Sequence, residues 1–464
     1  MNIDKNTFYF IAIGGVGMSA LAKYLIKRGA KVEGSDIQES KYTHLLEKAG
    51  AKIHIGHNAD NINKDMIVVA SSAIRQTNPE IVRAKELGLK IYHRSDILKM
   101  ISDEFSQRKE SIFFGFSGTH GKTTTSGLCA YVLNKAGLKP SYVVGGIIPE
   151  IGENGAFDGD KYFSAELDES DGTIVKYSTD IAVINNMEED HLDHYINGFA
   201  DIAKTFNEYL SNKPTQKVII NSDNNGNKEF MKLYPNYNFI TFGKSNADYE
   251  IKNIKFEGLG SSFTIYYKGE KIDDLKLSVL GEHNVYNATA VYIALREANI
   301  NVSTMKDYFY SFSGMGRRFQ KVCEFNNIKV FDDYAHHPSE IKTTLNGLKN
   351  AVKNNNRVVA IFQPHRYTRL QSLWNDFKTA FDSADELLII DVYAASEDKI
   401  DGITSENFAK DIQHKNAKYV SGNIDECSKK IYDELKPNDI AVTLGAGTVT
   451  NIGKLLNNIY EERK

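Results

Sequence analysis

The sequence IFFGFSGTHGKTTTSGLCAYVLNKAG, residues 112–137, decides the fold of this chain. Its apolar beginning, 112–116, predicts a buried strand, and the apolar spacing over 124–135 predicts a helix that ends at Gly137. A strand that turns through glycines into a helix places several backbone N–H groups, and the positive end of the helix dipole, at one point. This arrangement predicts a binding site for phosphate groups.

The turn between the strand and the helix resembles the nucleotide-binding loop G-x-x-x-x-G-K-[ST], although Phe116 stands where that pattern begins with glycine. The shorter pattern G-x-x-G-K-T remains. Lys122 supplies a cation, and the hydroxyl of Thr123 can bind Mg²⁺ beside a triphosphate. An ordinary glycine-rich turn needs neither residue, so we expect ATP here. The residues predicted to hold its phosphates are Gly118, Thr119, His120, Gly121, Lys122, Thr123 and Thr124.

Length and composition restrict the remaining alternatives. With 464 residues the chain is long enough for about three domains, and its net charge of −4 offers no basic surface for nucleic acid. Three scattered cysteines form no disulfide or zinc pattern, which is typical of a reducing compartment. Since no signal-like segment or membrane-length apolar run is present, we expect a cytoplasmic protein without membrane insertion.

The N-terminal hundred residues predict a Rossmann-like domain. A strand at 8–13 continues through Ala12-Ile13-Gly14-Gly15-Val16-Gly17 into a helix at 18–28, which resembles the dinucleotide fingerprint with alanine in its first place. A second strand, 30–34, leads to Asp36, where a ribose-binding acid is expected. NAD, a nucleotide-sugar, or tight packing of the helix on the strand all explain the glycines. The polar stretch 102–111 predicts a linker.

Glu166 and His191, which follow the phosphate loop in the sequence, extend the predicted site. Glu166 ends a strand at 162–167, and His191 follows a strand at 181–185. Ligands of α/β sheets bind at the carboxyl ends of strands, so Lys122, Glu166 and His191 can share one phosphate-and-metal site. Carboxylate and hydroxyl oxygens suit Mg²⁺. His191 can equally be a solvent-exposed histidine, and its spacing to His194 lacks a third ligand for zinc.

The second half of the chain predicts a small antiparallel insertion and a third domain. Alternating residues over 247–278 predict the insertion, and a helix follows to about 298. His283, Asn284 and Asn287 at its start are helix caps or adenine contacts. Beyond a hinge at 314–319, alternating strands and helices predict a second Rossmann-like sheet. At the end of one strand, Arg366 and Arg369 lie three residues apart, either as a surface pair or on one side of a helical turn that holds a carboxylate.

Eight segments follow one another along the chain: IGGVGMSA (13–20), SGTHGKTTT (117–125), ELDESDG (166–172), NNMEEDHLDHY (185–195), GEHNVYNA (281–288), GMGRRFQ (314–320), DDYAHHP (332–338) and HRYTR (365–369). Together, and over essentially the whole chain, they resemble the Mur ligase family of peptidoglycan synthesis. The resemblance implies an α/β protein of three domains. A Rossmann-like domain for a UDP-sugar spans 1–105, a P-loop-type ATPase domain with a mostly parallel sheet spans 106–316, and a Rossmann-like domain for an amino acid spans 317–464.

The resemblance is strongest to family members that use ATP and Mg²⁺ or Mn²⁺ to join L-alanine to the lactyl carboxylate of UDP-N-acetylmuramate. This reaction adds the first amino acid to the peptidoglycan precursor and passes through an acyl phosphate. The implied catalytic residues are Lys122, Glu166, His191 and Arg318, and the implied metal ligands are Thr123, Glu166 and His191. Besides the phosphate loop, the implied ATP-binding residues are His283, Asn284, Asn287, Arg318 and Asp333. The implied UDP-sugar-binding residues are Gly15, Val16, Gly17, Asp36, Ser71, Ser72, Arg75, His93 and Arg94, and those for the amino acid are Tyr334, His336, Arg366 and Arg369.

Several alternatives stay open. A ligase that recycles a preformed murein tripeptide shares the first two domains, but the segment HRYTR favours the alanine enzyme. A nicotinamide-dependent dehydrogenase explains only the N-terminal fingerprint, and a non-catalytic nucleotide-binding module leaves Lys122, Glu166 and His191 without a role. Some family members carry a carbamylated lysine, but Phe206 occupies the expected place and Lys204 lies two residues before it, so none is predicted here. A monomer or weak homodimer is expected.

Overall fold

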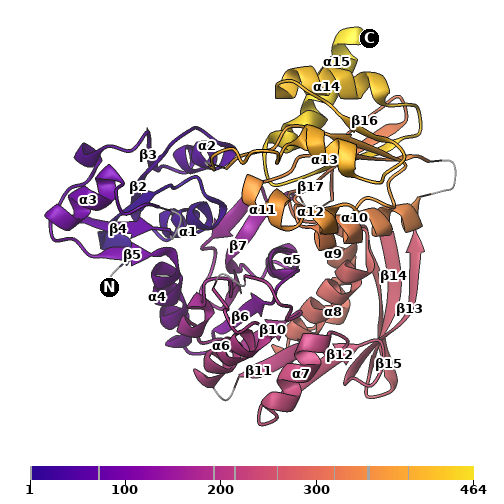
Figure 1. Ribbon diagram of the computed structural model, residues 1–464. Coiled ribbons are helices and arrows are strands. Elements are labelled where there is room, and N and C mark those ends of the chain that lie inside the picture. Colours follow the sequence, from indigo (N-terminus) through magenta and orange to yellow (C-terminus); the bar gives the residue numbers. More distant parts are fainter. Residues whose placement is uncertain are drawn as a thin grey trace. The chain divides into compact units, whose positions relative to one another are not determined.

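The computed structural model describes residues 3–71, 74–191, 194–213, 216–258, 260–317, 319–352, 356–395 and 397–464 (Figure 1). The chain divides into two compact units. Unit 1 comprises Met1–Ile254, Phe263–Lys276 and Val285–Phe312, and unit 2 comprises Lys255–Ser262, Leu277–Asn284 and Ser313–Lys464. Three sheets organise these units, and short 3₁₀ helices connect some of their elements: η1 (Ile3–Lys5), η2 (Ala59–Asn61), η3 (Thr173–Lys176), η4 (Val302–Met305) and η5 (Thr448–Asn451).

The first sheet is parallel and has the strand order β3-β2-β1-β4-β5. Side chains alternate along β1, so Phe8 and Phe10 join one core cluster while Tyr9 and Ile11 join another with Ile81. Helices therefore cover both faces, as the βαβ pattern predicted. The strands are β1 (Thr7–Ile11), β2 (Lys31–Asp36), β3 (Lys52–Ile55), β4 (Met66–Ala70) and β5 (Ile91–His93), and the helices are α1 (Val16–Lys27), α2 (Lys41–Lys48), α3 (Pro79–Glu86) and α4 (Arg94–Ser106).

The central sheet has the strand order β15-β14-β13-β12-β11-β10-β6-β9-β7-β8. Its middle strands pair in parallel around β6, and β7 pairs with β8 antiparallel. The turns that join β13, β14 and β15 are too short for a crossover, so these neighbours run antiparallel, as predicted. The strands are β6 (Ile112–Ser117), β7 (Ser141–Ile148), β8 (Glu153–Ala156), β9 (Tyr162–Glu166), β10 (Ile181–Ile184), β11 (Lys217–Asn221), β12 (Phe239–Gly243), β13 (Tyr249–Glu257), β14 (Gly260–Tyr267) and β15 (Glu270–Leu277). The helices are α5 (Lys122–Lys135), α6 (Phe199–Ser211), α7 (Asn225–Leu233), α8 (Glu282–Glu297) and α9 (Lys306–Ser311).

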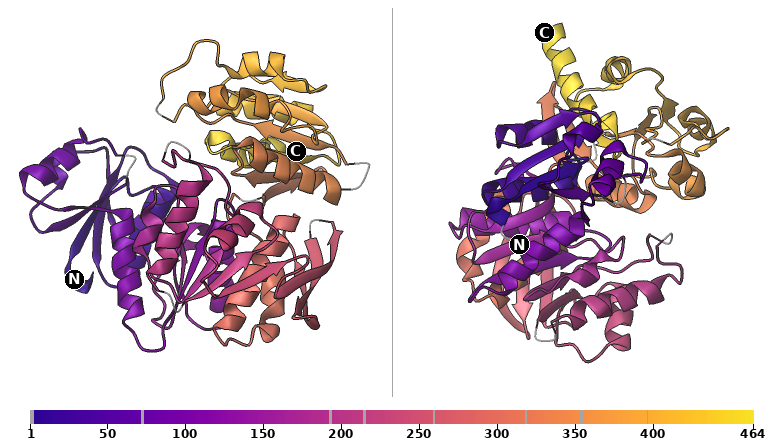
Figure 2. Two further views of the ribbon diagram at one scale, coloured as in Figure 1. Left: turned by 60° about the horizontal axis from the view of Figure 1, so that its bottom comes forward. Right: turned by 90° about the vertical axis from the view of Figure 1, so that its left-hand side faces the viewer.

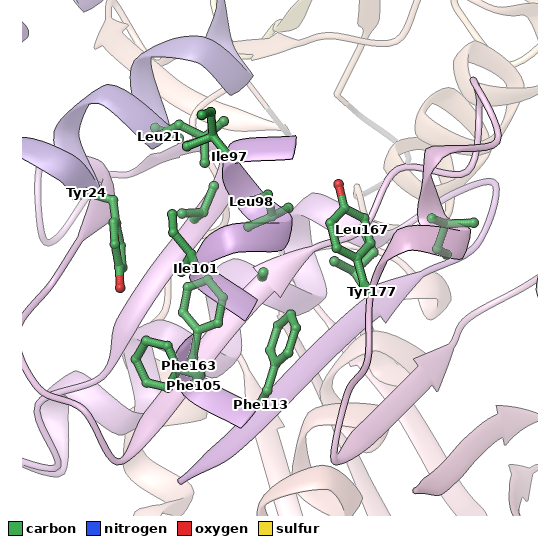
Figure 3. Packing of buried hydrophobic residues seen from close by; sticks show 14 of the residues in the cluster. Leu21, Tyr24, Ile97, Leu98, Ile101, Phe105, Phe113, Phe163, Leu167 and Tyr177 are labelled. Carbon is green, nitrogen blue, oxygen red and sulfur yellow. The ribbon is translucent and has the colours of Figure 1, made fainter. Parts of the chain in front are cut away.

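The first sheet and the central sheet share one hydrophobic core (Figure 3). The ring of Phe163 on β9 stacks on Phe105 of α4 at 4.8 Å between centroids, and meets Tyr24 of α1 edge-on at 5.9 Å. Polar contacts join the same elements, since Asn154 of β8 donates a 3.0 Å hydrogen bond to Ser19 of α1. The glycine turn at the start of α1 is therefore held against the sheet that carries β6 and α5.

The third sheet belongs to unit 2 and has the strand order β16-β17-β21-β18-β19-β20. The C-terminal part of the chain, which forms this sheet, is coloured orange to yellow in Figure 2. Alternate residues of β18 face opposite clusters: Ala360 and Phe362 pack with Leu345, whereas Val359 and Ile361 pack with residues of the opposite face. The strands are β16 (Gln320–Phe325), β17 (Ile328–Asp333), β18 (Val358–Phe362), β19 (Glu386–Ile389), β20 (Ala417–Tyr419) and β21 (Ile440–Leu444). The helices are α10 (Pro338–Ala351), α11 (Tyr367–Ser372), α12 (Trp374–Phe377), α13 (Ser405–Asp411), α14 (Ile424–Glu434) and α15 (Ile452–Arg463).

The structure corrects one prediction about the organisation of the chain. The stretch 102–111 is not a linker throughout, because α4 continues to Ser106. Its polar residues alternate with Ile101 and Phe105, which are fully buried, so the segment is an amphipathic helix that packs in the shared core.

Candidate active site

The phosphate loop has the predicted strand–turn–helix geometry. Helix α5 begins at Lys122, two residues earlier than predicted, and Gly118 and Gly121 have φ values of +121° and +86°, which only glycine adopts readily. The loop is enclosed by amides, because the backbone N–H of His120 donates to Asn186 Oδ1 at 2.7 Å. A Cβ on Gly121 would lie 2.7 Å from Asn287 Oδ1, so α8 brings Asn287 to the loop.

Lys122 points into its own loop and against an acidic side chain. Its ammonium group donates to the carbonyl oxygens of Gly118 at 2.8 Å and Thr119 at 3.3 Å, and to Glu169 Oε1 at 2.8 Å. Burial alone would lower the pKa of Lys122, but the charges of Glu169, Asp168 and Glu166 outweigh burial and raise it. The lysine therefore remains a cation.

Glu166 and Thr123 both place an oxygen atom close to Gly145. Glu166 Oε2 accepts a 2.9 Å hydrogen bond from the backbone N–H of Gly145 on β7. A Cβ on Gly145 would overlap that carboxylate and lie 2.9 Å from Thr123 Oγ1, so both oxygens face the gap that this glycine leaves. Oxygen ligands of this kind fit Mg²⁺.

The structure does not assemble the predicted metal ligands into a complete cluster. Within the described ranges, no three His, Cys, Asp or Glu side chains gather as a metal-binding group. His191 has a φ of +53°, and its Nε2 lies 3.7 Å from Asp190, a neighbour in sequence. Its place in the site stays a prediction.

The N-terminus of α1 brings several of the predicted sugar-nucleotide residues together. Gly15 is the residue that precedes the helix, Val16 begins it, and a Cβ on Gly17 would lie 3.5 Å from Arg94 Nη1. Asp36 Oδ2 accepts a 2.8 Å hydrogen bond from the backbone N–H of Gly14, so this acid also holds the glycine turn.

His93 and Arg94 lie at the start of α4. The Nε2 atom of His93 is buried without a hydrogen-bond partner in the part of the chain that the structure describes, which leaves a polar atom for a ligand. Burial and the charge of Arg94 lower the pKa of His93. Ser71 is half-buried at the end of β4 and Arg75 is exposed, while Ser72 lies outside the described residues.

The residues predicted to bind the amino acid follow the carboxyl ends of β17 and β18 in the third sheet. The ring of His336 lies 5.2 Å from that of Tyr334 and 5.8 Å from that of His365. Arg369 Nη1 contacts His365 Nδ1 at 2.9 Å. Arg366 does not share a helical turn with Arg369 as expected, because its φ of +70° places it before α11 begins.

His365 was not among the predicted site residues, although it is the first residue of HRYTR and directly follows the end of a strand. Burial, followed by the charges of His336, Arg369 and Arg366, lowers its pKa to about 4. The imidazole is therefore neutral near pH 7, in contact with Arg369, one of the two arginines predicted to hold a carboxylate.

Asp333 and Arg317 organise the beginning of the third sheet. The carboxylate of Asp333 accepts hydrogen bonds from the backbone N–H groups of Phe319 at 2.9 Å and Ala335 at 2.8 Å. Arg317, which the predicted site omitted, donates to Gly445 O at 2.6 Å and lies 4.8 Å from the Tyr334 ring centre. Arg318 itself lies outside the described residues.

The remaining ATP-site predictions concern the first turn of α8. Asn284 Nδ2 donates to Leu280 O at 2.7 Å and lies 3.2 Å from His283 Nε2. These local contacts explain how the turn is formed, and they leave the proposed adenine contacts untested.

Three family models match consecutive parts of the chain. They are described as the Mur ligase family, catalytic domain, at residues 7–106, the Mur ligase middle domain, at 116–295, and the Mur ligase, glutamate ligase domain, at 317–447. The chain belongs to the Mur ligase family. The resemblance drawn from the eight sequence segments is thus confirmed, and so is the predicted α/β architecture of a three-domain Mur ligase.

Similar proteins extend over the same length as this Mur ligase. A UDP-N-acetylmuramate–L-alanine ligase of Geotalea daltonii is 38% identical over 453 residues, which cover 97% of this chain and 96% of the relative. The solved structure of the UDP-N-acetylmuramate–alanine ligase MurC of Thermotoga maritima has a TM-score of 0.84 at 29% identity, covering 99% of this chain and 100% of that one. A murein peptide ligase of Psychrobacter arcticus shares the fold, with a TM-score of 0.71 at 22% identity, covering 98% of each chain.

The family membership leaves the dehydrogenase alternative without support, since the N-terminal glycines are part of a Mur ligase domain. Among the described helices, none combines the length and the apolar composition needed to cross a bilayer.

Proposed function

We propose that this Mur ligase joins L-alanine to the lactyl carboxylate of UDP-N-acetylmuramate at the expense of ATP. The observation that carries this proposal is the match to ligases of that name along the whole chain, third domain included. The geometry agrees, because the phosphate loop of α5 holds a charged lysine, as a nucleotide triphosphate requires.

In the first step, an oxygen of the lactyl carboxylate attacks the γ-phosphorus of ATP, and ADP leaves. Phosphoryl transfer depends on positioning and on neutralising charge, which the loop N–H groups and Lys122 supply. Thr123 and Glu166 would hold Mg²⁺, which would neutralise phosphate charge when bound. We propose that His191 and Arg318 also belong to this step. Asn287 adjoins the loop. We also propose His283, Asn284 and Asp333 as ATP-binding residues.

In the second step, the amine of alanine attacks the carbonyl carbon of the acyl phosphate and a tetrahedral intermediate forms. The C–O bond to phosphate then breaks, phosphate leaves with the electron pair, and the nitrogen loses a proton to give the amide. Arg366 and Arg369 are the proposed partners of the alanine carboxylate, and Tyr334 and His336 line the same site. The neutral imidazole of His365 contacts Arg369, so it helps to orient that guanidinium without adding a positive charge.

The proposed sugar-nucleotide site is the N-terminus of α1. Its N–H groups and Arg94 suit a pyrophosphate, and Asp36 supports the glycine turn. His93, Ser71, Ser72 and Arg75 extend this site. We keep the boundaries 1–105, 106–316 and 317–464 for the UDP-sugar, ATP and amino-acid domains. ATP and nucleotide-sugars are cytoplasmic metabolites, so we place the reaction in the cytoplasm.

The first experiment measures ADP release from ATP, Mg²⁺ and UDP-N-acetylmuramate, with L-alanine in one tube and L-Ala-γ-D-Glu-meso-diaminopimelate in another. Turnover with alanine, and a product heavier by one alanyl residue, is the expected result. Turnover with the tripeptide alone would assign the chain to the recycling reaction. A NAD(P)H absorbance assay without change would complete the exclusion of a dehydrogenase.

The variant Lys122→Ala should reduce ADP formation at least about 10³-fold, because the transferred phosphate loses its cation. Lys135→Ala, an exposed lysine at the other end of α5, is the matched control and should behave as the wild type. Lys122→Ala leaves the buried carboxylate of Glu169 without its ion-pair partner Lys122. The double variant Lys122→Ala/Glu169→Gln therefore shows whether the reduced ADP formation comes from that unpaired charge or from the loss of the catalytic cation. Normal turnover in either Lys122 variant would remove this lysine from the mechanism.

A further inference from the structure

An acidic turn, residues 168–171, follows β9 and carries the carboxylates of Asp168, Glu169 and Asp171. Two of these carboxylates lie against cations that the proposed function assigns to two different substrates. The turn therefore lies between the proposed sugar-nucleotide site and the proposed ATP site.

Asp168 forms an ion pair with Arg94. Its Oδ2 accepts a 2.7 Å hydrogen bond from Arg94 Nη2, and the side chains are 28% and 29% exposed. Arg94 also borders Gly17 at the N-terminus of α1, where the pyrophosphate is proposed to bind. A bound pyrophosphate would compete with Asp168 for this guanidinium.

Glu169 forms an ion pair with Lys122. An ammonium group has three N–H donors, and the carbonyl groups of Gly118 and Thr119 together with Glu169 account for three acceptors. Glu169 is the anion among these acceptors, and its side chain is only 5% exposed. Its second oxygen, Oε2, is buried without a hydrogen-bond partner in the described structure. A γ-phosphate at Lys122 would therefore displace a carboxylate whose ion-pair partner, among the described residues, is Lys122.

The two carboxylates belong to neighbouring residues of one short turn. They are adjacent in sequence, and the turn is fixed at both ends: the N–H of Leu167 donates to Phe116 O at 2.9 Å, and the N–H of Gly172 donates to Glu169 O at 2.9 Å. A movement of the turn as a whole that takes Asp168 away from Arg94 would also take Glu169 away from Lys122.

We propose that Asp168 and Glu169 form a latch that couples the two nucleotide sites, so that each nucleotide, by opening the latch, strengthens the binding of the other. This inference rests on the proposed function, because it uses the proposed substrates. Both residues are positioning residues that act through Arg94 and Lys122. The coupling must be reciprocal, since both ligands favour the same open state.

The test is isothermal titration calorimetry with the full chain. Binding of Mg²⁺ with AMP-PNP, a non-hydrolysable ATP analogue, is measured with and without saturating UDP-N-acetylmuramate, and the reverse titration is also made. In the wild type, each ligand should lower the Kd of the other about tenfold. In Glu169→Gln and in Asp168→Asn, the Kd of each nucleotide measured without the other should fall towards the value measured when the other is saturating. The ratio of these two Kd values should therefore shrink below about twofold.

Asp171→Asn is the matched control. Asp171 carries the same charge in the same turn and lies 3.8 Å from Arg94, but its hydrogen bonds go to Thr173, which asparagine can still satisfy. Loss of a charge alone shifts both titrations, with and without the partner, and cancels in their ratio, so this variant should keep the tenfold coupling.

Each other outcome is decisive. If the wild type binds both ligands with no coupling, or if both latch variants retain tenfold coupling, the latch is wrong and the proposed function stands. If UDP-N-acetylmuramate does not bind and alanine supports no turnover, the proposed function is wrong, and so is the latch proposal that rests on it. Melting curves of the two independent variants identify one that has failed to fold, and the other then decides.

Discussion

At the scale of single residues, Gly145 shows how a missing side chain can shape a site. Gly145→Ala places a methyl group on the Glu166 carboxylate and 2.9 Å from Thr123 Oγ1. We expect the Mg²⁺ concentration that gives half-maximal activity to rise about tenfold or more, because the carboxylate must turn away from the site. Gly347→Ala, whose nearest neighbours would be 3.9 Å away, is the control. An unchanged Mg²⁺ requirement in Gly145→Ala would place the metal elsewhere.

A second residue-scale prediction concerns His365. Its pKa of about 4 lies below the ordinary value near 6.5, so the folded state disfavours the protonated form. The sign follows from linkage: its stabilising contribution is complete above about pH 6.5 and is lost as the pH falls towards 4. An NMR titration of the imidazole should show a midpoint near pH 4. Arg369→Ala should raise this midpoint, and a wild-type midpoint at pH 6 or above would contradict the burial argument.

The same residues show how far the sequence alone can define the site. The phosphate loop was predictable because its glycines, Lys122 and Thr123 are contiguous. Gly145 was not, since its contact with Glu166 depends on the pairing of β7 with β9. The ion pair of Arg94 with Asp168 joins residues 74 positions apart and depends on how α4 packs beside the central sheet. Contacts of this kind leave no local pattern.

At the scale of elements, the periodic signals predicted strands well. The strands predicted at 112–116, 162–167 and 181–185 differ by one residue from β6, β9 and β10, because short apolar runs between polar residues have few alternatives. The supposed linker at 102–111 was wrong in its first half, because the hydrophilic residues of α4 concealed the buried Ile101 and Phe105. Amphipathic helices near domain borders are easily mistaken for loops when only polarity is considered.

Helix α10 provides an element-scale prediction. Gly347 lies inside this helix, and a Cβ there would make only ordinary contacts at 3.9 Å. Gly347→Ala should therefore raise the free energy of unfolding by about 0.5–1 kcal/mol, since alanine loses less backbone entropy on folding. Urea unfolding of unit 2 measures this gain. A destabilised variant would show that the helix needs the space that glycine leaves.

At the scale of the whole molecule, the first two sheets should unfold together, because they share one core. Phe163→Ala removes a ring that contacts both Phe105 and Tyr24, and should cost about 3–5 kcal/mol. The single tryptophan, Trp374, lies in unit 2 and packs in a different cluster. In urea, the part of the far-UV circular dichroism signal that unit 1 contributes should be lost at a lower urea concentration than in the wild type. The urea concentration at which the Trp374 fluorescence changes should stay the same.

Ile196→Ala is the control for this prediction, because Ile196 is 85% exposed. It should leave both transitions unchanged. If Phe163→Ala split the unit 1 signal so that binding of UDP-N-acetylmuramate survived after binding of AMP-PNP was lost, the shared core would not be the source of cooperativity.

The division of the chain into units has a practical consequence for engineering. Unit 2 includes Lys255–Ser262 and Leu277–Asn284, which precede its main segment, Ser313–Lys464. A chimera made by a single crossover at residue 313, to exchange amino-acid specificity between two relatives, would leave those two segments with the wrong parent. A successful exchange needs all three segments from one donor, so recombination between such genes should favour several short crossovers over one.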